Sequence, residues 1–297
     1  MPDEDDRPAA DPLIEAREVT RTYGGVAVLR SASAAFPPGL TAVIGPNGSG
    51  KSTLLGTLVG RVLPVEGAVL RRGPAAGARI GYLPQDVPFR DDFTAKETLA
   101  FYARLADAGP GAADDALASV GLVDAGDRRV DALSGGMRRL LGIAVATLGE
   151  PPVVVLDEPT SGLDPGMRER AFAAAADRAD GGTAVVVSTH DLGLAEAHAD
   201  RVVALHRGRV AAAGRIDALR ATHDVDDLTG LYRSIVDTNG SRGAEGTNRQ
   251  SGDGQSAGEA GSESGSKAGS APGTESESDG GSGSDSGTVH VPGVSDR

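Results

Sequence analysis

The sequence predicts an α/β domain built on a mainly parallel sheet, and two observations indicate this fold class. Along the middle of the chain, short apolar runs of the strand type alternate with longer stretches of helical character. Such alternation is typical of strands joined by crossover helices. Two of the runs, at 153–156 and 184–188, are almost continuously apolar, as expected for strands covered on both faces. No internal repeat is visible, so we expect one such unit in the chain.

Each expected element rests on a local pattern. The run at 41–44 is mostly apolar and breaks into a glycine-rich turn. The stretch 94–106 begins with Thr94 and has Glu97 three residues later, a capping-box pattern, and its apolar residues recur at helical spacing. The alanine-rich stretch 165–179 begins with proline, which helices accept at their first position. We therefore predict strands at 41–44, 69–70, 80–83, 153–156 and 184–188, and helices at 51–59, 94–106, 114–120, 136–148 and 165–179.

Composition excludes several classes of protein. The 297 residues include no cysteine, which rules out a disulfide scaffold, a thiolate metal site and a cysteine nucleophile. No apolar run approaches about 18 residues, so we expect no segment that spans a bilayer. The first residues are acidic and lack an apolar stretch, so we expect no secretory signal either.

The two ends of the chain differ from its middle. Residues 238–297 contain 15 Gly and 13 Ser and almost no large apolar side chains, so we predict that this segment is disordered. The acidic residues 1–11 are interpreted as a shorter segment of the same kind. The folded domain is then expected over 12–237. The tail is interpreted as a passive end, with a solvating or tethering role as the alternative.

The charge balance argues against a nucleic-acid partner. The net charge is −13, and much of the excess lies in the two ends, so no basic patch is available for phosphate backbones. Only three of the 29 cationic residues are lysine. This acidic, lysine-poor composition favours a halophilic, high-salt cytoplasm, where charge repulsion is screened. A high-GC genome that favours Arg, Ala and Gly is the alternative.

A glycine-rich loop follows the run at 41–44 and opens the helix at 51–59. It contains the pattern G-x-x-x-x-G-K-S in the strand–helix context that this motif requires. The glycines let backbone N–H groups surround phosphate oxygens, Lys51 reaches the β- and γ-phosphates, and the Ser52 hydroxyl ligates Mg²⁺. The sequence therefore predicts binding of a nucleoside triphosphate with Mg²⁺. The expected phosphate-binding residues are Gly45, Pro46, Asn47, Gly48, Ser49, Gly50, Lys51, Ser52 and Thr53.

Two adjacent carboxylates, Asp157 and Glu158, end the buried run at 153–156. Because successive strand residues point in opposite directions, the two groups can take different roles. One can hold Mg²⁺ through water while the other faces the attacking water. Such a pair on its own is usually just solvated, but beside a phosphate loop it is a specific signal of triphosphate hydrolysis.

The stretch 133–137, Leu-Ser-Gly-Gly-Met, resembles the LSGGQ signature of the nucleotide-binding domains of ABC transporters. It lies about 20 residues before the Asp-Glu pair, as in that family, and the motifs over 12–215 follow the family order. The resemblance implies ATP hydrolysis by a P-loop NTPase core with an antiparallel β subdomain and a small helical signature subdomain at about 86–150. Met137 stands where the family usually has Gln, and the Met-Arg-Arg that begins there resembles the ABC-2-type branch.

The resemblance also implies roles for single residues around the nucleotide. Tyr23 resembles the aromatic residue that stacks on adenine, Gln85 the glutamine that links Mg²⁺ and water to the membrane partner, and His190 the switch histidine near the γ-phosphate. Glu158 resembles the general base, which leaves Asp157 for the metal. Ordinary packing, turn and loop roles are the alternatives for Tyr23, Gln85 and His190.

Further implied roles concern a second copy of the chain. In the family, two ATP-binding domains pair head to tail, so that the signature of one closes over the ATP of the other. Ser134, Gly135 and Gly136 would contact that γ-phosphate, and Asp164 belongs to a loop at 161–164 that communicates across the dimer. The sequence does not decide whether the dimer is formed by identical chains.

The implied partners include separate transmembrane permease subunits, which would hold the chain at the inner face of the cell membrane. Residues 86–93, with Phe89 and Phe93, are the candidate docking surface, and a place in the core of the helical subdomain is the alternative. A soluble ABC-type ATPase of a cluster-assembly machinery is the second functional hypothesis. A kinase or small GTPase would have no reason to carry the 133–137 stretch. The transported substrate and the direction of transport stay open.

Overall fold

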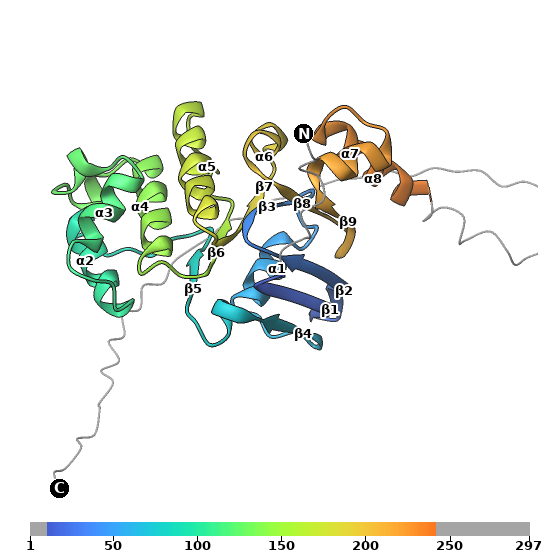
Figure 1. Cartoon of the computed structure of the whole chain (residues 1–297), viewed down its shortest axis with the longest axis horizontal. Coiled ribbons are helices and arrows are strands. Elements are labelled where there is room, and N and C mark those ends of the chain that lie inside the picture. The colour runs from blue at the N-terminus through green and yellow to red at the C-terminus, as the bar shows by residue number, and fades with distance from the viewer. Residues whose placement is uncertain (1–10, 242–297) are drawn as a thin grey trace, which may run out of the picture. The chain divides into compact units, whose positions relative to one another are not determined.

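The computed structural model describes residues 11–241, which contain two sheets (Figure 1). The larger sheet has six strands in the order β5-β6-β7-β3-β8-β9. Its first five strands are parallel, and β9 pairs antiparallel with β8 at the edge. The prediction of a mainly parallel sheet is therefore confirmed. The six strands are β3 (Gly39–Ile44), β5 (Ile80–Leu83), β6 (Val153–Asp157), β7 (Ala184–Thr189), β8 (Arg201–His206) and β9 (Arg209–Arg215).

The smaller sheet is antiparallel and has the order β2-β1-β4. A tight turn at Gly24 and Gly25, both with positive φ, joins its first two strands. This sheet corresponds to the expected antiparallel subdomain, although the strand predicted at 69–70 is longer in the structure. Its strands are β1 (Ile14–Tyr23), β2 (Val26–Phe36) and β4 (Glu66–Arg71).

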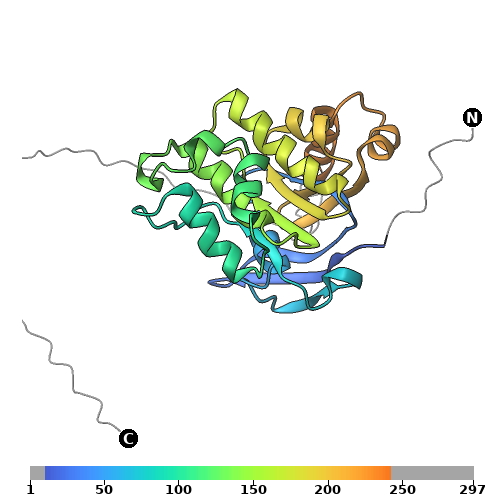
Figure 2. The ribbon, with the colours of Figure 1, turned by 60° about the vertical axis from the view of Figure 1, so that its left-hand side comes forward.

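The helices fall into groups that follow the chain order, as the colours in Figure 2 show. Helix α1 follows β3 and packs on both sheets, whereas α5 and α6 connect strands of the large sheet. Helices α7 and α8, after β9, lie against each other and against β9 and α6. These five helices are α1 (Lys51–Leu58), α5 (Pro165–Asp180), α6 (Leu192–His198), α7 (Ile216–His223) and α8 (Leu228–Ser241).

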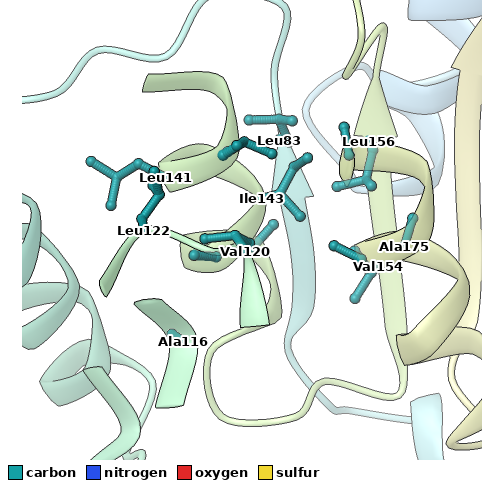
Figure 3. Close-up of a cluster of buried hydrophobic side chains, with 14 of the residues drawn as sticks. Leu83, Ala116, Val120, Leu122, Leu141, Ile143, Val154, Leu156 and Ala175 are labelled. Atoms are coloured by element: carbon teal, nitrogen blue, oxygen red, sulfur yellow. The ribbon is translucent and has the colours of Figure 1, made fainter. Parts of the chain in front are cut away.

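Helices α2 (Ala95–Leu105), α3 (Ala112–Ser119) and α4 (Gly135–Thr147) form a lobe beside β5 and β6. The predicted capping box at the start of α2 is confirmed: the Thr94 hydroxyl accepts from the Glu97 N–H at 3.1 Å, and the Glu97 carboxylate accepts from the Thr94 N–H at 2.9 Å. Figure 3 shows apolar side chains of the lobe and of the strands beside it gathered in one buried cluster. The packing fixes α4 against the strand ends that carry the site.

The C-terminal boundary differs from the sequence prediction. We expected the folded domain to end at residue 237, but α8 continues to Ser241. In its first half, Leu228, Leu231 and Ile235 are buried. They belong to an apolar cluster that also contains residues of β3, such as Ile44, and of β8. Disorder is predicted for 1–11 and 238–297; of these, residues 238–241 belong to α8, whereas 1–10 and 242–297 lie outside the described residues. Within residues 11–241, no helix is both long enough and apolar enough to cross a membrane.

The sheet topology brings distant parts of the sequence to one edge. Strand β3 pairs with β7, and β6 pairs with both β5 and β7, all in parallel. The carboxyl ends of these four strands are therefore neighbours, and ligand sites of open α/β sheets form at such an edge. The segments that follow the strands carry the phosphate loop, Gln85, Glu158 and His190.

Candidate active site

A cleft of about 470 Å³ opens at this edge of the large sheet. It brings together the phosphate loop, Gln85, Glu158 and His190, which lie far apart in the sequence. Two residues that sequence analysis did not assign to the nucleotide, Val28 of β2 and Ser161, also contribute to its wall. The lining residues are Val28, Asn47, Gly48, Gly50, Lys51, Ser52, Thr53, Gln85, Glu158, Ser161 and His190.

Three residues of the phosphate loop, Gly45, Pro46 and Ser49, do not line this cleft. Ser49 is buried, and Gly45 and Pro46 line a neighbouring hollow together with Tyr232 of α8. Gly50 needs to be glycine for two reasons: its φ is +105°, and a Cβ there would lie 2.9 Å from the Val28 carbonyl oxygen. The loop can therefore fold closely over the start of α1, where helix N–H groups offer an anion site.

Lys51 is the buried cation of the cleft. Its Nζ donates to the Gly45 carbonyl at 2.9 Å and more weakly to the Pro46 carbonyl at 3.4 Å. The same Nζ lies 3.7 Å from Glu158 Oε1. A buried ammonium with these contacts is held beside the loop backbone, at the place where a phosphate would enter. The arrangement agrees with the phosphate-binding role that the sequence predicts for Lys51.

Ser52 and Asp157 form a pair of hard oxygen donors. The Ser52 hydroxyl donates to Asp157 Oδ1 at 3.1 Å, and the Ser188 hydroxyl donates to the same oxygen at 2.6 Å. Magnesium prefers oxygen ligands and usually keeps several waters and substrate phosphates. Within residues 11–241, no three His, Cys, Asp or Glu side chains converge as a metal cage. Two protein oxygens beside a phosphate loop therefore suit Mg²⁺, whose other ligands would be water and substrate phosphates.

The Glu158 carboxylate lies between His190 and Lys51. Its Oε2 is 2.9 Å from His190 Nδ1, and its Oε1 faces Lys51. The backbone of Glu158 is in the left-handed region, with φ +51°. Residues other than glycine rarely adopt this conformation. Its N–H donates to the Ser188 hydroxyl at 2.8 Å. Backbone strain of this kind is frequent at functional sites, where surrounding contacts maintain it.

Arg139 of α4 reaches the same edge from the helical lobe. The side chain is buried, and its two terminal nitrogens donate to backbone carbonyls of Gln85 and Glu158, among others. Burial lowers the pKa of the guanidinium, and the nearby carboxylates of Asp157, Asp86 and Glu158 oppose this shift. Sequence analysis named Arg139 only within the Met-Arg-Arg stretch and gave neither Arg139 nor Ser188 a role in the site. Their partners are distant in sequence, so no local pattern could have revealed them.

Tyr23 does not line the cleft. The residue ends β1, is 45% exposed, and has the Arg21 guanidinium over its ring, 4.6 Å from the ring centre. Val28, on the neighbouring strand, is the residue of the small sheet that reaches the cleft wall. One face of Tyr23 is therefore covered by Arg21, and its stacking on adenine remains a prediction.

The signature segment also lies outside the cleft of its own chain. Ser134 is the N-cap of α4 and accepts from the Met137 N–H at 3.2 Å. Gly135 is exposed, whereas Gly136 packs so closely against Met167 that a Cβ would collide with its sulfur. Asp164 caps α5 by accepting from the Met167 N–H at 3.0 Å. None of these residues contributes to the cleft wall.

Comparisons with known proteins place the chain in a family. Residues 29–161 match the family model described as "ABC transporter". Over 245 residues the chain is 38% identical to the cobalt import ATP-binding protein CbiO of Rhodobacter capsulatus, an alignment that covers 76% of this chain and 86% of that protein. The chain belongs to the ABC transporter family of ATP-binding proteins.

Other relatives of this ABC protein are named for the import of other substrates. It is 38% identical to the hemin import ATP-binding protein HmuV of Nocardia farcinica over 212 residues, which are 67% of this chain and 73% of that protein. It is 37% identical to the zinc import ATP-binding protein ZnuC of Halorhodospira halophila over 212 residues, 69% of this chain and 78% of that protein.

Solved structures show the same fold. An ATP-binding subunit of an ABC transporter superposes with a TM-score of 0.68 at 27% identity, over 75% of this ABC protein and 99% of that chain. A dimeric cassette in a post-hydrolysis state with ADP and Pi matches in fold, with a TM-score of 0.61 at 24% identity over 68% of this chain and 98% of that one. The expected P-loop fold with its antiparallel and helical subdomains is confirmed.

Family membership establishes the general activity. ABC ATP-binding proteins are ATPases, so this protein binds and hydrolyses ATP. The family assignment rests on the alignment over 245 residues and not on a single motif. The cleft adds that the phosphate loop and Glu158 of the acidic pair, which the sequence identified separately, lie around one space.

Proposed function

We propose that the protein is the energising subunit of an ABC transporter, which dimerises on Mg·ATP and drives separate transmembrane subunits. The observation that carries this proposal is the position of Glu158 in the cleft. Its carboxylate lies between Lys51 and His190, next to the Ser52–Asp157 pair. Phosphate binding, metal binding and proton removal can therefore take place within one space.

The proposed reaction is an in-line attack of water on the γ-phosphate. Glu158 accepts a proton from the water as its oxygen bonds to phosphorus, and the bond from phosphorus to the ADP oxygen breaks. His190 orients the Glu158 carboxylate through the 2.9 Å contact. Lys51 moves from Glu158 toward the phosphates as they enter. Ser52 would hold Mg²⁺ directly, and Asp157 and Gln85 would hold it through water; the bound ion would supply positive charge that offsets the charge of the phosphates.

The proposed dimer completes the site. Ser134, Gly135 and Gly136 do not line the cleft of their own chain, and two of them are exposed at the start of α4. A helix start with a serine cap is suited to bind an anion. In the proposal, this segment of one copy covers the γ-phosphate held by the other, with Asp164 at the same interface. Hydrolysis removes the shared γ-phosphate contact, and the copies separate.

The proposed docking surface for the permease lies beside Gln85. Phe89 packs against the core of the helical lobe, with its ring centre 6.5 Å from that of Tyr102, so the core role is supported for this residue. Phe93 contacts Phe101, and the Arg90 guanidinium lies over both rings. This mixed aromatic and cationic face is partly exposed. We therefore place the contact with a transmembrane subunit at Arg90, Phe93 and Phe101.

The proposal places the protein at the cytoplasmic face of a membrane, bound through its partner. The test is purification of the affinity-tagged chain from its native host in mild detergent. We expect a multi-spanning membrane protein at a stoichiometric ratio, and a higher ATPase rate with that partner than without it. Recovery of only soluble assembly factors, with no membrane protein, would contradict the transporter assignment and favour the cluster-assembly hypothesis.

A further inference from the structure

Arg139 makes an unusual set of contacts for a buried cation. Its Nη1 donates to the carbonyls of Pro84 at 2.8 Å and Gln85 at 2.6 Å. Its Nη2 donates to the carbonyls of Asp157 and of Glu158, the latter at 2.8 Å. The side chain is only 7% exposed. Each terminal nitrogen thus contacts the backbone of a different segment, and the rigid guanidinium fork sets the distance between the two segments.

The two segments follow adjacent strands. Strands β5 and β6 are parallel and paired up to Leu83 and Leu156, and their ladder ends there. The carbonyls just beyond this pair lie outside the β5–β6 ladder, and that of Glu158 also accepts from the Ser161 N–H at 3.1 Å. Arg139 supplies donors for them from the first turns of α4, five residues after the Ser134 cap. One side chain therefore joins the signature helix to the segment of Gln85 and to that of Glu158.

The contact with Glu158 falls on a strained backbone. With φ at +51°, this residue needs surrounding contacts to keep its conformation. Both of its backbone polar groups are held: the N–H donates to Ser188, and the carbonyl accepts from Arg139 and from the Ser161 N–H. The direction of the Glu158 side chain, and its alignment with Lys51 and His190, depends on this backbone conformation.

We propose that Arg139 is a positioning residue for hydrolysis, which holds the backbones of Glu158 and Gln85 in register with the start of α4. The inference rests on the proposed role of Glu158 as general base. Arg139 itself does not line the cleft, so it acts through Glu158 rather than on ATP. A shift of α4, which carries the signature, would be transmitted directly to the residue that activates water.

The first test compares Arg139→Met with Arg178→Met. Arg178 of α5 is a matched control, because it is also partly buried and donates to a backbone carbonyl, that of Thr147, but it lies away from the cleft. In Arg139→Met we expect kcat to fall by about 10- to 100-fold, with an ATP Kd within about threefold of the wild type. Arg139→Lys should lose less than Arg139→Met, because its ammonium still donates hydrogen bonds, although it lacks the planar fork. Arg178→Met should keep the wild-type kcat.

A wild-type kcat in Arg139→Met would overturn the inference, as would an equal loss in the Arg178→Met control. If Arg139→Met does not fold, the kcat and Kd of Arg139→Lys decide in the same way. A role in stability alone predicts a lower melting temperature and an unchanged kcat per folded molecule.

The second test is a double-mutant cycle with Glu158→Gln, measured in single-turnover hydrolysis. If Arg139 acts through Glu158, then Arg139→Met should slow hydrolysis little in the Glu158→Gln background. A full additional loss in that background would contradict the inference. The cycle also separates the two proposals: a normal rate in Glu158→Gln alone refutes the general base, whereas the comparison with Arg178→Met tests Arg139 independently.

Discussion

His190 Nδ1 lies 2.9 Å from Glu158 Oε2, although 32 residues separate the two in the chain. The contact exists because β6 and β7 are adjacent parallel strands, and each residue directly follows the end of its strand. Glu158 Oε1 faces Lys51 at the same time. The carboxylate is therefore oriented from both sides by groups of the same chain.

Replacement of Glu158 by Gln keeps the size of the side chain and removes its ability to accept a proton. We expect steady-state hydrolysis to slow by about 10²- to 10⁴-fold, the range for loss of a general base. Binding of ATP should persist, because the phosphate loop is unchanged. Phosphate release and equilibrium binding of a fluorescent ATP analogue measure the two effects. Normal turnover by the variant would refute the assignment of Glu158 as the base.

His190→Ala removes the group that orients the carboxylate but leaves Glu158 in place. We expect kcat to fall, by less than in Glu158→Gln, with little change in ATP Kd. His198→Ala is the control, since His198 contacts Glu169 and the Phe172 ring, away from the cleft. A larger change in Kd than in kcat for His190→Ala would show that this residue binds nucleotide instead of positioning the base.

Lys51→Ala should abolish ATP retention, because the buried ammonium is the cation of the phosphate loop. The Lys51 contact with Glu158 is also lost, so the fold must be checked by circular dichroism. Equilibrium dialysis with labelled ATP measures binding. An unchanged affinity in the folded variant would mean that the phosphates are held elsewhere.

The role of Tyr23 can be separated from that of the phosphate loop by the choice of ligand. If Tyr23 stacks on adenine, Tyr23→Ala should weaken ATP binding by about 1–3 kcal/mol, the range for a stacked base. Binding of inorganic tripolyphosphate, which has no base, should not change. Equal affinities of the variant and the wild type for ATP would show that Tyr23 has no part in nucleotide binding.

The C-terminal helix is expected to stabilise the domain. Leu231 of α8 is fully buried beside Ile44, the last residue of the strand that leads into the phosphate loop. Leu231→Ala should lower the free energy of unfolding by about 2–5 kcal/mol, as measured by urea denaturation. Truncation after Ser241 should leave both stability and ATPase activity near the wild type. A large loss on that truncation would show that residues 242–297 contribute to folding or catalysis.

The sequence predicted the parts of the fold and site whose signals are local. The strand that leads into the phosphate loop, the capping box at Thr94 and the Asp157–Glu158 pair each depend on a few neighbouring residues. The cleft then brings together Lys51, Gln85 and Glu158, because their parallel strands carry them to the same edge of one sheet.

What the sequence could not predict depends on contacts between distant segments. Arg139 looks like an ordinary charged residue of an amphipathic helix, and its partners lie at Gln85 and Glu158, 54 and 19 residues away. Ser188 ends an apolar strand and gives no sign that it holds Asp157. The packing of α8 on β3 was also missed, because the glycine- and serine-rich composition begins within that helix.

If ATP is bound between two copies of the chain, the molar mass of Glu158→Gln should depend on Mg·ATP. Gly135→Glu provides the control, because Gly135 is exposed and a Cβ there meets nothing within 4 Å, so the isolated chain should tolerate the change. In light scattering, we predict a dimer for Glu158→Gln with Mg·ATP, and a monomer without ATP or when Gly135→Glu is added. A Glu158→Gln protein that binds Mg·ATP and stays monomeric, alone and with its membrane partner, would contradict the account.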